Sequence, residues 1–269
     1  MTITTVEQAI LNIKPVEYFH KAKSGNLVIG NPFCTIFSDG IPCPAVAPTP
    51  GLAGEALTSL SGAIPFPSTV SGKTIHLTNY IGTTTATPGT LLLTDFLWWN
   101  SGITVNTSSL QTINSVAFPA RDKNGSTDGA GVQVGLLVST GTGNGSPDLT
   151  LTYTNQAGTS GRVATNIQAT SSQTILGTLY QFGLQAGDTG VRSIQSYQQS
   201  SNWTAGVAHL VAYRVVATLD LLGPAQPEQL NILTGGLPRC YDGSCLVPIL
   251  LPSYTYSTIL YGSCTFAQD

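Results

Sequence analysis

The sequence predicts an all-β protein, built as a β-sandwich or jelly-roll-like domain with a short N-terminal helix and an extended arm rich in proline and glycine. Three observations predict this class. Short apolar or alternating segments recur between residues 73 and 222 without an intervening helical pattern. Links rich in glycine, asparagine and aspartate separate them. Only 9% of the residues are charged, while Gly reaches 29 and threonine is frequent, which favours pleated sheets and tight turns.

The N-terminal residues 4–23 carry the only pattern typical of a helix. Its apolar face consists of Val6, Ala9, Ile10 and Ile13. Thr5 stands where an N-cap is expected, and Pro15 either limits the helix or starts a second turn.

Residues 24–71 form the predicted arm, which completes an N-terminal region of residues 1–72. The segments "GNPFCTIFSDGIPCPAVAPTPG" and "GAIPFPSTVSG" are dense in proline and glycine and show little periodicity. Phe33, Phe37 and Phe66 argue against disorder, so we expect an extended arm that lies across a surface, either its own or a neighbour's.

Residues 73–222 are expected to form the sandwich. The predicted strands are KTIHLTNY, TLLLTDFLWWN, GVQVGLLVST, LTLTYT, QTILGTLYQFGLQ, VRSIQSYQQ and AGVAHLVAYRVVATLDLL. Residues 223–269 are expected to form a C-terminal extension packed on the same domain. Pro248 and Pro252 predict edge or irregular structure in its first part, and residues 256–266 alternate as in a closing strand.

The charge pattern excludes some classes of partner. The formal net charge is -3, and the ten Lys and Arg residues are scattered singly, so no basic patch predicts nucleic-acid binding. No apolar run approaches the ~20 residues that span a bilayer, and no secretory signal is visible at the N-terminus. We therefore expect synthesis in a cytoplasm and no membrane or nucleic-acid partner.

The cysteines leave three possibilities open. They are Cys34, Cys43, Cys240, Cys245 and Cys264. An odd number without a signal peptide favours free thiols. Cys240 and Cys245 flank the turn-forming "YDGS", so a disulfide between them is the candidate pairing, while their spacings match no common zinc site.

The segment "RDKNGSTDGAG" offers one weak metal candidate. Asp122, Asn124, Ser126 and Asp128 alternate as the first ligands of a calcium loop do. The usual glycine and the bidentate glutamate are missing, so an Asx-type turn is the simpler interpretation.

The sequence offers no constellation for catalysis. No G-x-S-x-G, HExxH, Walker A or CxxC motif occurs, and most aspartates stand in turn contexts. His76 and His209 lie within predicted strands, where a histidine bonded to its neighbours is the simpler interpretation. We expect no catalytic residue, no cofactor and no enzymatic activity, with a polysaccharide depolymerase as a minor alternative.

The stretch "DLTLTYTNQAGTSGR", residues 148–162, is unusual for a soluble domain. It reads as half of a β-hairpin followed by a tip of Asn, Gln, Gly, Thr and Ser without charge. An uncharged rim allows close self-contact without repulsion between identical neighbours.

Long stretches of the chain resemble a family of structural proteins from tailed-bacteriophage virions. They are "LWWNSGI", "FPARDKNGSTDGAGVQVGLLVSTGTGNGSPDLTLTYTNQAGTSGR" and "LQAGDTGVRSIQSYQQSSNWTAGVAHLVAYRVVATL", within residues 73–220. The resemblance implies a virion location, on the capsid surface, after synthesis in the bacterial host cytoplasm. It implies a capsid decoration or cement subunit that contacts the major capsid protein and copies of itself in a homo-oligomer, for which a trimer is one expected form.

A binding module on a tail or head fibre is the alternative function. Such a module would recognise host-surface glycans by stacking aromatic rings on sugars. Trp98 and Trp99 lie in an apolar run, which predicts burial, so Trp203 between "SSN" and "TAG" is the candidate for exposed stacking.

Overall fold

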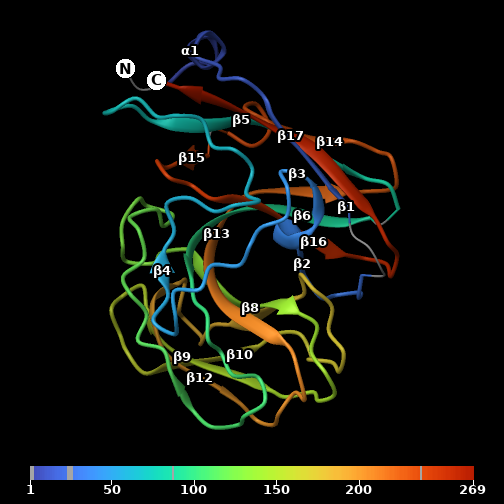
Figure 1. Ribbon diagram of the computed structural model, residues 1–269. Coiled ribbons are helices and arrows are strands. Elements are labelled where there is room, and N and C mark those ends of the chain that lie inside the picture. The colour runs from blue at the N-terminus through green and yellow to red at the C-terminus, as the bar shows by residue number, and fades with distance from the viewer. Residues whose placement is uncertain (1–2, 23–26, 87, 237) are drawn as a thin grey trace. The chain divides into compact units, whose positions relative to one another are not determined.

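A computed structural model describes residues 3–22, 27–86, 88–236 and 238–269 (Figure 1). The chain forms two compact units, each assembled from segments distant in sequence. Unit 1 comprises Met1–Ala45, Thr58–Asp95 and Val215–Asp269, and unit 2 comprises Val46–Leu57 and Phe96–Arg214. These bounds differ from the predicted divisions at residues 72 and 222, because two long strands contribute residues to both units. Lys23 and Ser24, at the predicted junction of helix and arm, lie outside the described residues.

Unit 1 contains a six-stranded antiparallel sheet in the order β14-β5-β17-β1-β3, with β15 also paired to β5. Its strands are β1 (Glu17–Ala22), β3 (Asp39–Ile41), β5 (Ile75–Thr84), β14 (Glu228–Asn231), β15 (Arg239–Cys240) and β17 (Ile259–Gln268). The predicted closing strand is β17, which pairs with both β5 and β1. One sheet face covers an apolar core that includes Phe19, Tyr80 and Phe266.

The first part of the C-terminal extension departs from prediction. Residues Leu246–Pro252 form β16, which pairs with residues 89–95 of β6 (Gly89–Trp99) on one side and with β2 (Phe33–Cys34) on the other. The expectation of edge or irregular structure is therefore wrong. Because β2 pairs only with Ile249 and Leu250, Pro248 needs no backbone N–H on that side, and its carbonyl accepts the Thr35 hydroxyl (2.8 Å).

The N-terminal helix is shorter than its pattern predicts. α1 spans Val6–Leu11, and the expected cap is confirmed: the Thr5 hydroxyl accepts the Gln8 N–H and the Gln8 side chain accepts the Thr5 N–H. Residues 17–22 form β1 instead of further helix. Pro15 cannot continue the helix, and the alternating burial that follows is that of a strand.

The arm lies on its own chain, which is one of the two predicted outcomes. In unit 1, the arm includes a 3-10 helix η1 (Thr35–Phe37). The N–H of Ile64 in the arm donates a hydrogen bond to the Leu246 carbonyl. In unit 2, β4 (Glu55–Ala56) pairs with Trp98 and Trp99 of β6. Both tryptophans are fully buried, as predicted.

Unit 2 is built from a continuous antiparallel sheet that curls around one apolar core. Its strands are β7 (Gln111–Thr112), β8 (Val132–Thr140), β9 (Leu149–Asn155), β10 (Arg162–Asn166), β11 (Leu179–Gly183) and β12 (Val191–Gln199), with parts of β6 and β13 (Val207–Leu221). The order runs β13-β8-β11-β10-β9-β12-β7. Side chains from all but the short β7 enter the core, so the predicted all-β, jelly-roll-like class is confirmed.

Candidate interaction surfaces

Three loops of unit 2 contact one another at the hairpin tip. We call them the loop cluster, which consists of residues 122–131, 155–161 and 184–190. The N–H of Gly131 donates to the Thr189 carbonyl (3.0 Å), and the N–H of Gln156 donates to the Gly190 carbonyl (3.1 Å). The Gln156 side-chain oxygen accepts the N–H groups of Thr189 and Gly190. A Cβ on Gly190 would lie 2.0 Å from the Gly129 carbonyl oxygen, so this close packing of the loops requires glycine.

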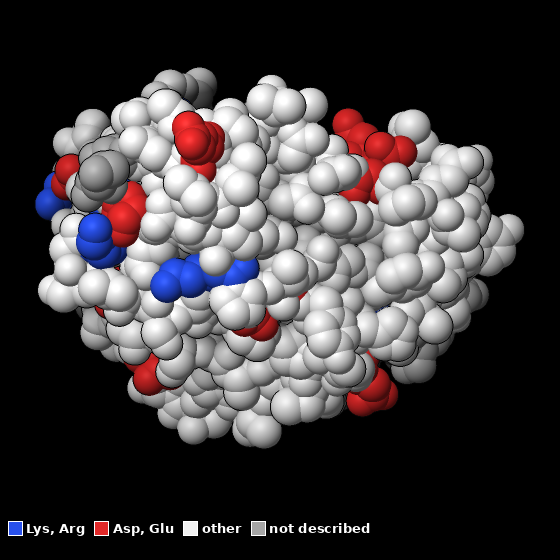
Figure 2. All heavy atoms as spheres, turned by 90° about the horizontal axis from the view of Figure 1, so that it is seen from above, with Lys and Arg blue, Asp and Glu red and all other residues white. Residues whose placement is uncertain are grey.

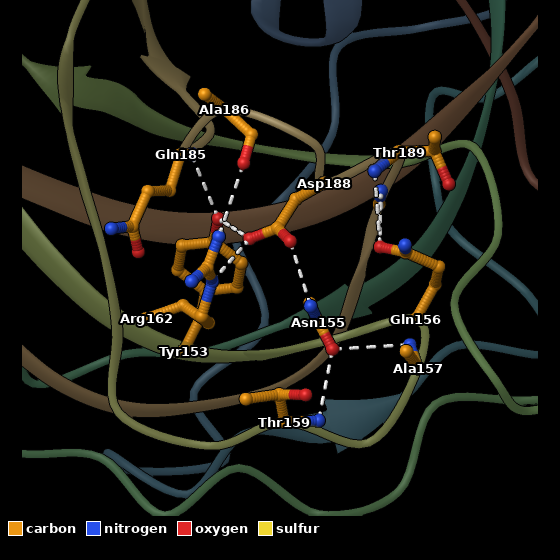
Figure 3. A network of polar contacts seen from close by, with 11 residues as sticks. Tyr153, Asn155, Gln156, Ala157, Thr159, Arg162, Gln185, Ala186, Asp188 and Thr189 are labelled. Atoms are coloured by element: carbon orange, nitrogen blue, oxygen red, sulfur yellow. Dashed lines mark hydrogen bonds and ion pairs between the residues drawn. The ribbon is translucent and has the colours of Figure 1, made fainter.

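Asp188 is the polar centre of the loop cluster (Figure 3). Its carboxylate is only 3% exposed and accepts hydrogen bonds from Arg162 Nε (2.8 Å), Asn155 Nδ2 (2.7 Å) and the Tyr153 hydroxyl. The Tyr153 oxygen in turn accepts the Gln185 N–H (2.9 Å). The Arg162 guanidinium, assisted by the hydroxyl and amide donors, lowers the pKa of Asp188 to about 2.

The same network fixes the uncharged tip of the hairpin. The Asn155 side-chain oxygen accepts the N–H groups of Ala157 (3.1 Å) and Thr159 (2.9 Å), which is an Asx-type turn. Gly158 and Gly161 have φ of +82° and +72°, where glycine is favoured. The exposed residues 157–161 thus present a shaped, uncharged surface.

We expect Asp188→Asn to loosen this tip without unfolding the chain. The amide cannot accept from all three donors as the carboxylate does, so hydrogen exchange at the Thr159 and Gln185 amides should accelerate by roughly tenfold. Exchange measured by NMR or mass spectrometry tests this, with Asp148→Asn at an exposed position as the control. Equal exchange in both variants would contradict the role assigned to Asp188.

The outer side of the sheet that carries the hairpin is covered by uncharged polar side chains. We call this surface the threonine face, which consists of Thr112, Thr150, Thr152, Thr154, Ser193, Ser196 and Gln198. The register places Thr152 opposite Ser196 on one side and opposite Val163 of β10 on the other. Leu149, Leu151 and Tyr153 alternate with the threonines and are fully buried. One side of β9 therefore serves the core, and the other presents threonine hydroxyl groups.

Two ion pairs lie near this surface. Arg162 of β10 pairs with Asp188 of the loop cluster (2.8 Å), and Arg192 of β12 pairs with Asp128 (3.6 Å). The face of the molecule seen in Figure 2 likewise carries few charged side chains among many uncharged ones. Among the described residues, no helix is both long and apolar enough to cross a membrane.

The calcium candidate is a hydrogen-bonded turn in the structure. Asp122 Oδ1 accepts the N–H groups of Asn124 (2.9 Å) and Ser126 (2.7 Å), and Oδ2 accepts the Ser126 hydroxyl and the Ala130 N–H. Burial of the carboxyl opposes ionisation, but these bonds outweigh it and lower the pKa of Asp122 below its usual value. The four donors use the lone pairs that a cation would need, and Asp128 reaches the turn only through the Ser126 hydroxyl (3.2 Å). The segment therefore forms the Asx-type turn that was the simpler interpretation of the sequence.

The candidate disulfide is not formed. All five cysteines lie among the described residues and none is in a disulfide bond. Cys245 is held by its backbone N–H, which donates to Asp95 Oδ1 (2.9 Å), and its thiol points to the Gly243 carbonyl (3.5 Å). Cys240 lies in the short strand β15, opposite Ile75 of β5. Separate backbone partners thus position the two thiols.

The structure overturns the prediction that Trp203 is exposed. Its side chain is 0% exposed, its ring stacks on Tyr180 (centroids 6.1 Å apart) and its indole N–H donates to the Ser171 carbonyl (3.2 Å). The polar residues "SSN" before Trp203 suggested a surface loop, but the chain turns into the core directly after them. Trp203 therefore offers no face on which a sugar could stack.

The described residues contain no group of three or more His, Cys, Asp or Glu side chains that could hold a metal ion. His209 behaves as a structural strand histidine: its ring nitrogens bond the Asn100 carbonyl and the Ser139 hydroxyl, both at 2.8 Å. Burial lowers the pKa of His209.

The sequence interpretation missed the importance of Asp188, which it counted only among the aspartates in turn contexts. A signal was present, because Arg162 ends the uncharged tip and Asp188 stands alone among uncharged residues in "AGDTG". Two isolated opposite charges in neighbouring loops favour an ion pair. The two loops are neighbours only because of the order of β9, β10 and β11 in the sheet, and no local sequence pattern predicts that order.

Comparisons with known proteins assign no family. No family model matches the chain, and no curated protein matches it. Solved structures that match include VP2 of infectious bursal disease virus in a subviral particle, at 10% identity and a TM-score of 0.19, covering 99% of this chain and 83% of that one. The VP1 pentamer of human polyomavirus 6 matches at 10% identity and a TM-score of 0.16, covering 96% and 98%. Scores this low carry no argument about function.

Proposed function

We propose that the chain is a non-catalytic structural subunit of a virion, specifically a decoration or cement subunit on the capsid of a tailed bacteriophage. It would act through contacts with copies of itself and with the major capsid protein. The observation that carries the proposal is the uncharged threonine face beside the loop cluster. The resemblance of residues 73–220 to phage structural proteins supports the same role.

The physical argument concerns how identical or repeated surfaces meet. Symmetry-related copies bring like surfaces together, and like charges there cost several kcal/mol. Hydroxyl and amide groups both donate and accept hydrogen bonds, so they can pair with copies of themselves. A loop cluster fixed by Asp188 and by glycine packing loses little conformational freedom on binding, which favours assembly.

Binding to capsids tests the proposal. Purified chain, mixed with heads of the virus that encodes it after removal of their own copies, should co-sediment with them, and labelled antibody should decorate intact virions. Thr152→Glu places a charge in the centre of the threonine face and should weaken binding at least about tenfold, or roughly 1.4 kcal/mol.

Thr140→Glu is the matched control, because Thr140 is an exposed strand residue of unit 2 outside the threonine face. It should bind as the unmodified chain does. Absence of the protein from purified virions, or equal binding by the two glutamate variants, would overturn the proposal.

A further inference from the structure

The outer face of the unit 1 sheet is apolar where β3, β1 and β17 lie side by side. A half-covered antiparallel sheet normally points polar side chains outward. Here Tyr18, Ile41 and Tyr261 are 56%, 44% and 37% exposed. The register pairs His20 with both Tyr261 and Ile41, so these rings and the isoleucine are neighbours.

Between these side chains lies a groove of about 470 Å³, which we call the aromatic groove. It is lined by Tyr18, Phe19, His20, Ile41, Tyr261, Gly262 and Ser263. None of its lining residues carries a formal charge at pH 7 when histidine is neutral. Phe19 and Gly262 are paired between β1 and β17, and the Phe19 ring packs in the core on the other side of the sheet.

The helix α1 leaves its larger apolar residues exposed, with Glu7 beside them. It buries Ala9, the smallest of its apolar residues, against Ile3 and Ala267. Leu11 and Ile10 are 76% and 59% exposed, and Val6 is also exposed. A helix on a protein surface normally buries its largest apolar residues, so this exposed side needs a partner.

The helix cannot fill the groove of its own chain. Ile13, just after α1, pairs with Ala267 at one end of β17, whereas Tyr18 pairs with Ser263 and His20 with Tyr261. At 3.3 Å per strand residue, the helix end of β17 and the groove are about 15–20 Å apart. Both surfaces are therefore left to a second molecule.

We propose that α1 of one copy of this chain binds in the aromatic groove of a second copy, and the reverse, across a two-fold axis. This inference rests on the proposed self-association and names its surface. A two-fold arrangement uses each surface once per subunit, so both apolar surfaces are covered. Together they amount to several hundred Å² per copy, on the order of the ~800 Å² that each partner buries in a standard interface.

The experiment is sedimentation velocity and native mass spectrometry of the full chain at roughly 1–100 μM, the range expected for a modest interface. The unmodified chain should contain a species of twice 28.0 kDa or a multiple of it. Leu11→Ser and Tyr261→Ser should each weaken this association by tenfold or more. Leu110→Ser, a similarly exposed leucine in unit 2, should leave it unchanged.

A cross-link tests the pairing directly. In a Cys43→Ser background, which removes the exposed native thiol, Leu11→Cys and Tyr261→Cys on separate copies should form an intermolecular disulfide. Each variant alone should not form it. Circular dichroism verifies that the variants are folded.

Three results would overturn the inference. They are a monomer at 100 μM, association that persists in Leu11→Ser and Tyr261→Ser, or a monomeric chain that binds an uncharged oligosaccharide through Tyr18 and Tyr261. None of them bears on the virion assay with Thr152→Glu, so failure of this interface is distinguishable from failure of the proposed function.

Discussion

Trp203→Ala is expected to lower the free energy of unfolding by roughly 3–5 kcal/mol, the cost of deleting a large buried aromatic side chain. The tryptophan is fully buried in the unit 2 core and stacks on Tyr180. Truncation would leave a cavity and release the Ser171 carbonyl from its indole donor. Urea unfolding, followed by circular dichroism, measures the change.

The matched control is Leu110→Ala, at a position that is 60% exposed in the same unit. Its effect should stay within about 0.5 kcal/mol. A loss below 1 kcal/mol in Trp203→Ala would mean that the tryptophan is at the surface, which would also restore it as a candidate for sugar stacking. Trp203→Phe should lose less stability than Trp203→Ala, because the phenylalanine ring fills most of the cavity.

Lys21→Met should destabilise unit 1 by about 2 kcal/mol at pH 7. Lys21 is 1% exposed in β1, and its Nζ donates to the carbonyl oxygens of Pro42 (2.6 Å) and Gly62 (3.3 Å), two points of the arm. Methionine fills a similar volume but leaves both carbonyls without this donor. Relief of the buried charge offsets only part of that loss.

The pH dependence gives a sharper test of Lys21. Burial lowers the pKa of Lys21 from 10.5 to about 8. Between these values the unfolded chain holds a proton that the folded chain has released, so stability rises with pH across this window. After a discount for screening by nearby solvent, the rise should be roughly 1–2 kcal/mol. The neutral amine still donates both hydrogen bonds.

Unfolding curves of the unmodified chain and of Lys21→Met between pH 7 and 11 measure this contribution by difference. The difference in free energy of unfolding between the unmodified chain and Lys21→Met should widen from pH 8 to 10.5. Lys73→Met, at an exposed lysine, is the control and should show no such change. A constant gap for Lys21→Met would show that the buried amine keeps its usual pKa.

Stability of the hairpin tip should also fall as the pH is lowered, but in an acidic range. The pKa of Asp188 is about 2 in the folded chain and 3.8 as its ordinary value. Its contribution is therefore complete above pH 4 and is lost as the pH falls toward 2. Exchange of the Thr159 amide, compared with Asp188→Asn over this range, measures the loss. Protection that stays constant down to pH 2 would contradict the assignment.

The sequence by itself determined the fold class, most strands of residues 73–222 and the N-cap of α1. These features depend on local patterns, such as the alternation of Leu149, Leu151 and Tyr153 with threonines, that act over a few residues. It also determined the uncharged character of the hairpin tip, because composition alone fixes which groups a loop offers.

Only the tertiary structure decided which residues meet. Trp203 is buried because the chain after "SSN" turns into the core. Asp188 accepts hydrogen bonds from Arg162 and Tyr153 because the strand order brings these residues next to it. Likewise, β1 replaces the end of the predicted helix because pairing with β17 is available there. Such contacts join residues far apart in the chain, and their free energy depends on the whole packed arrangement, which no short window of sequence contains.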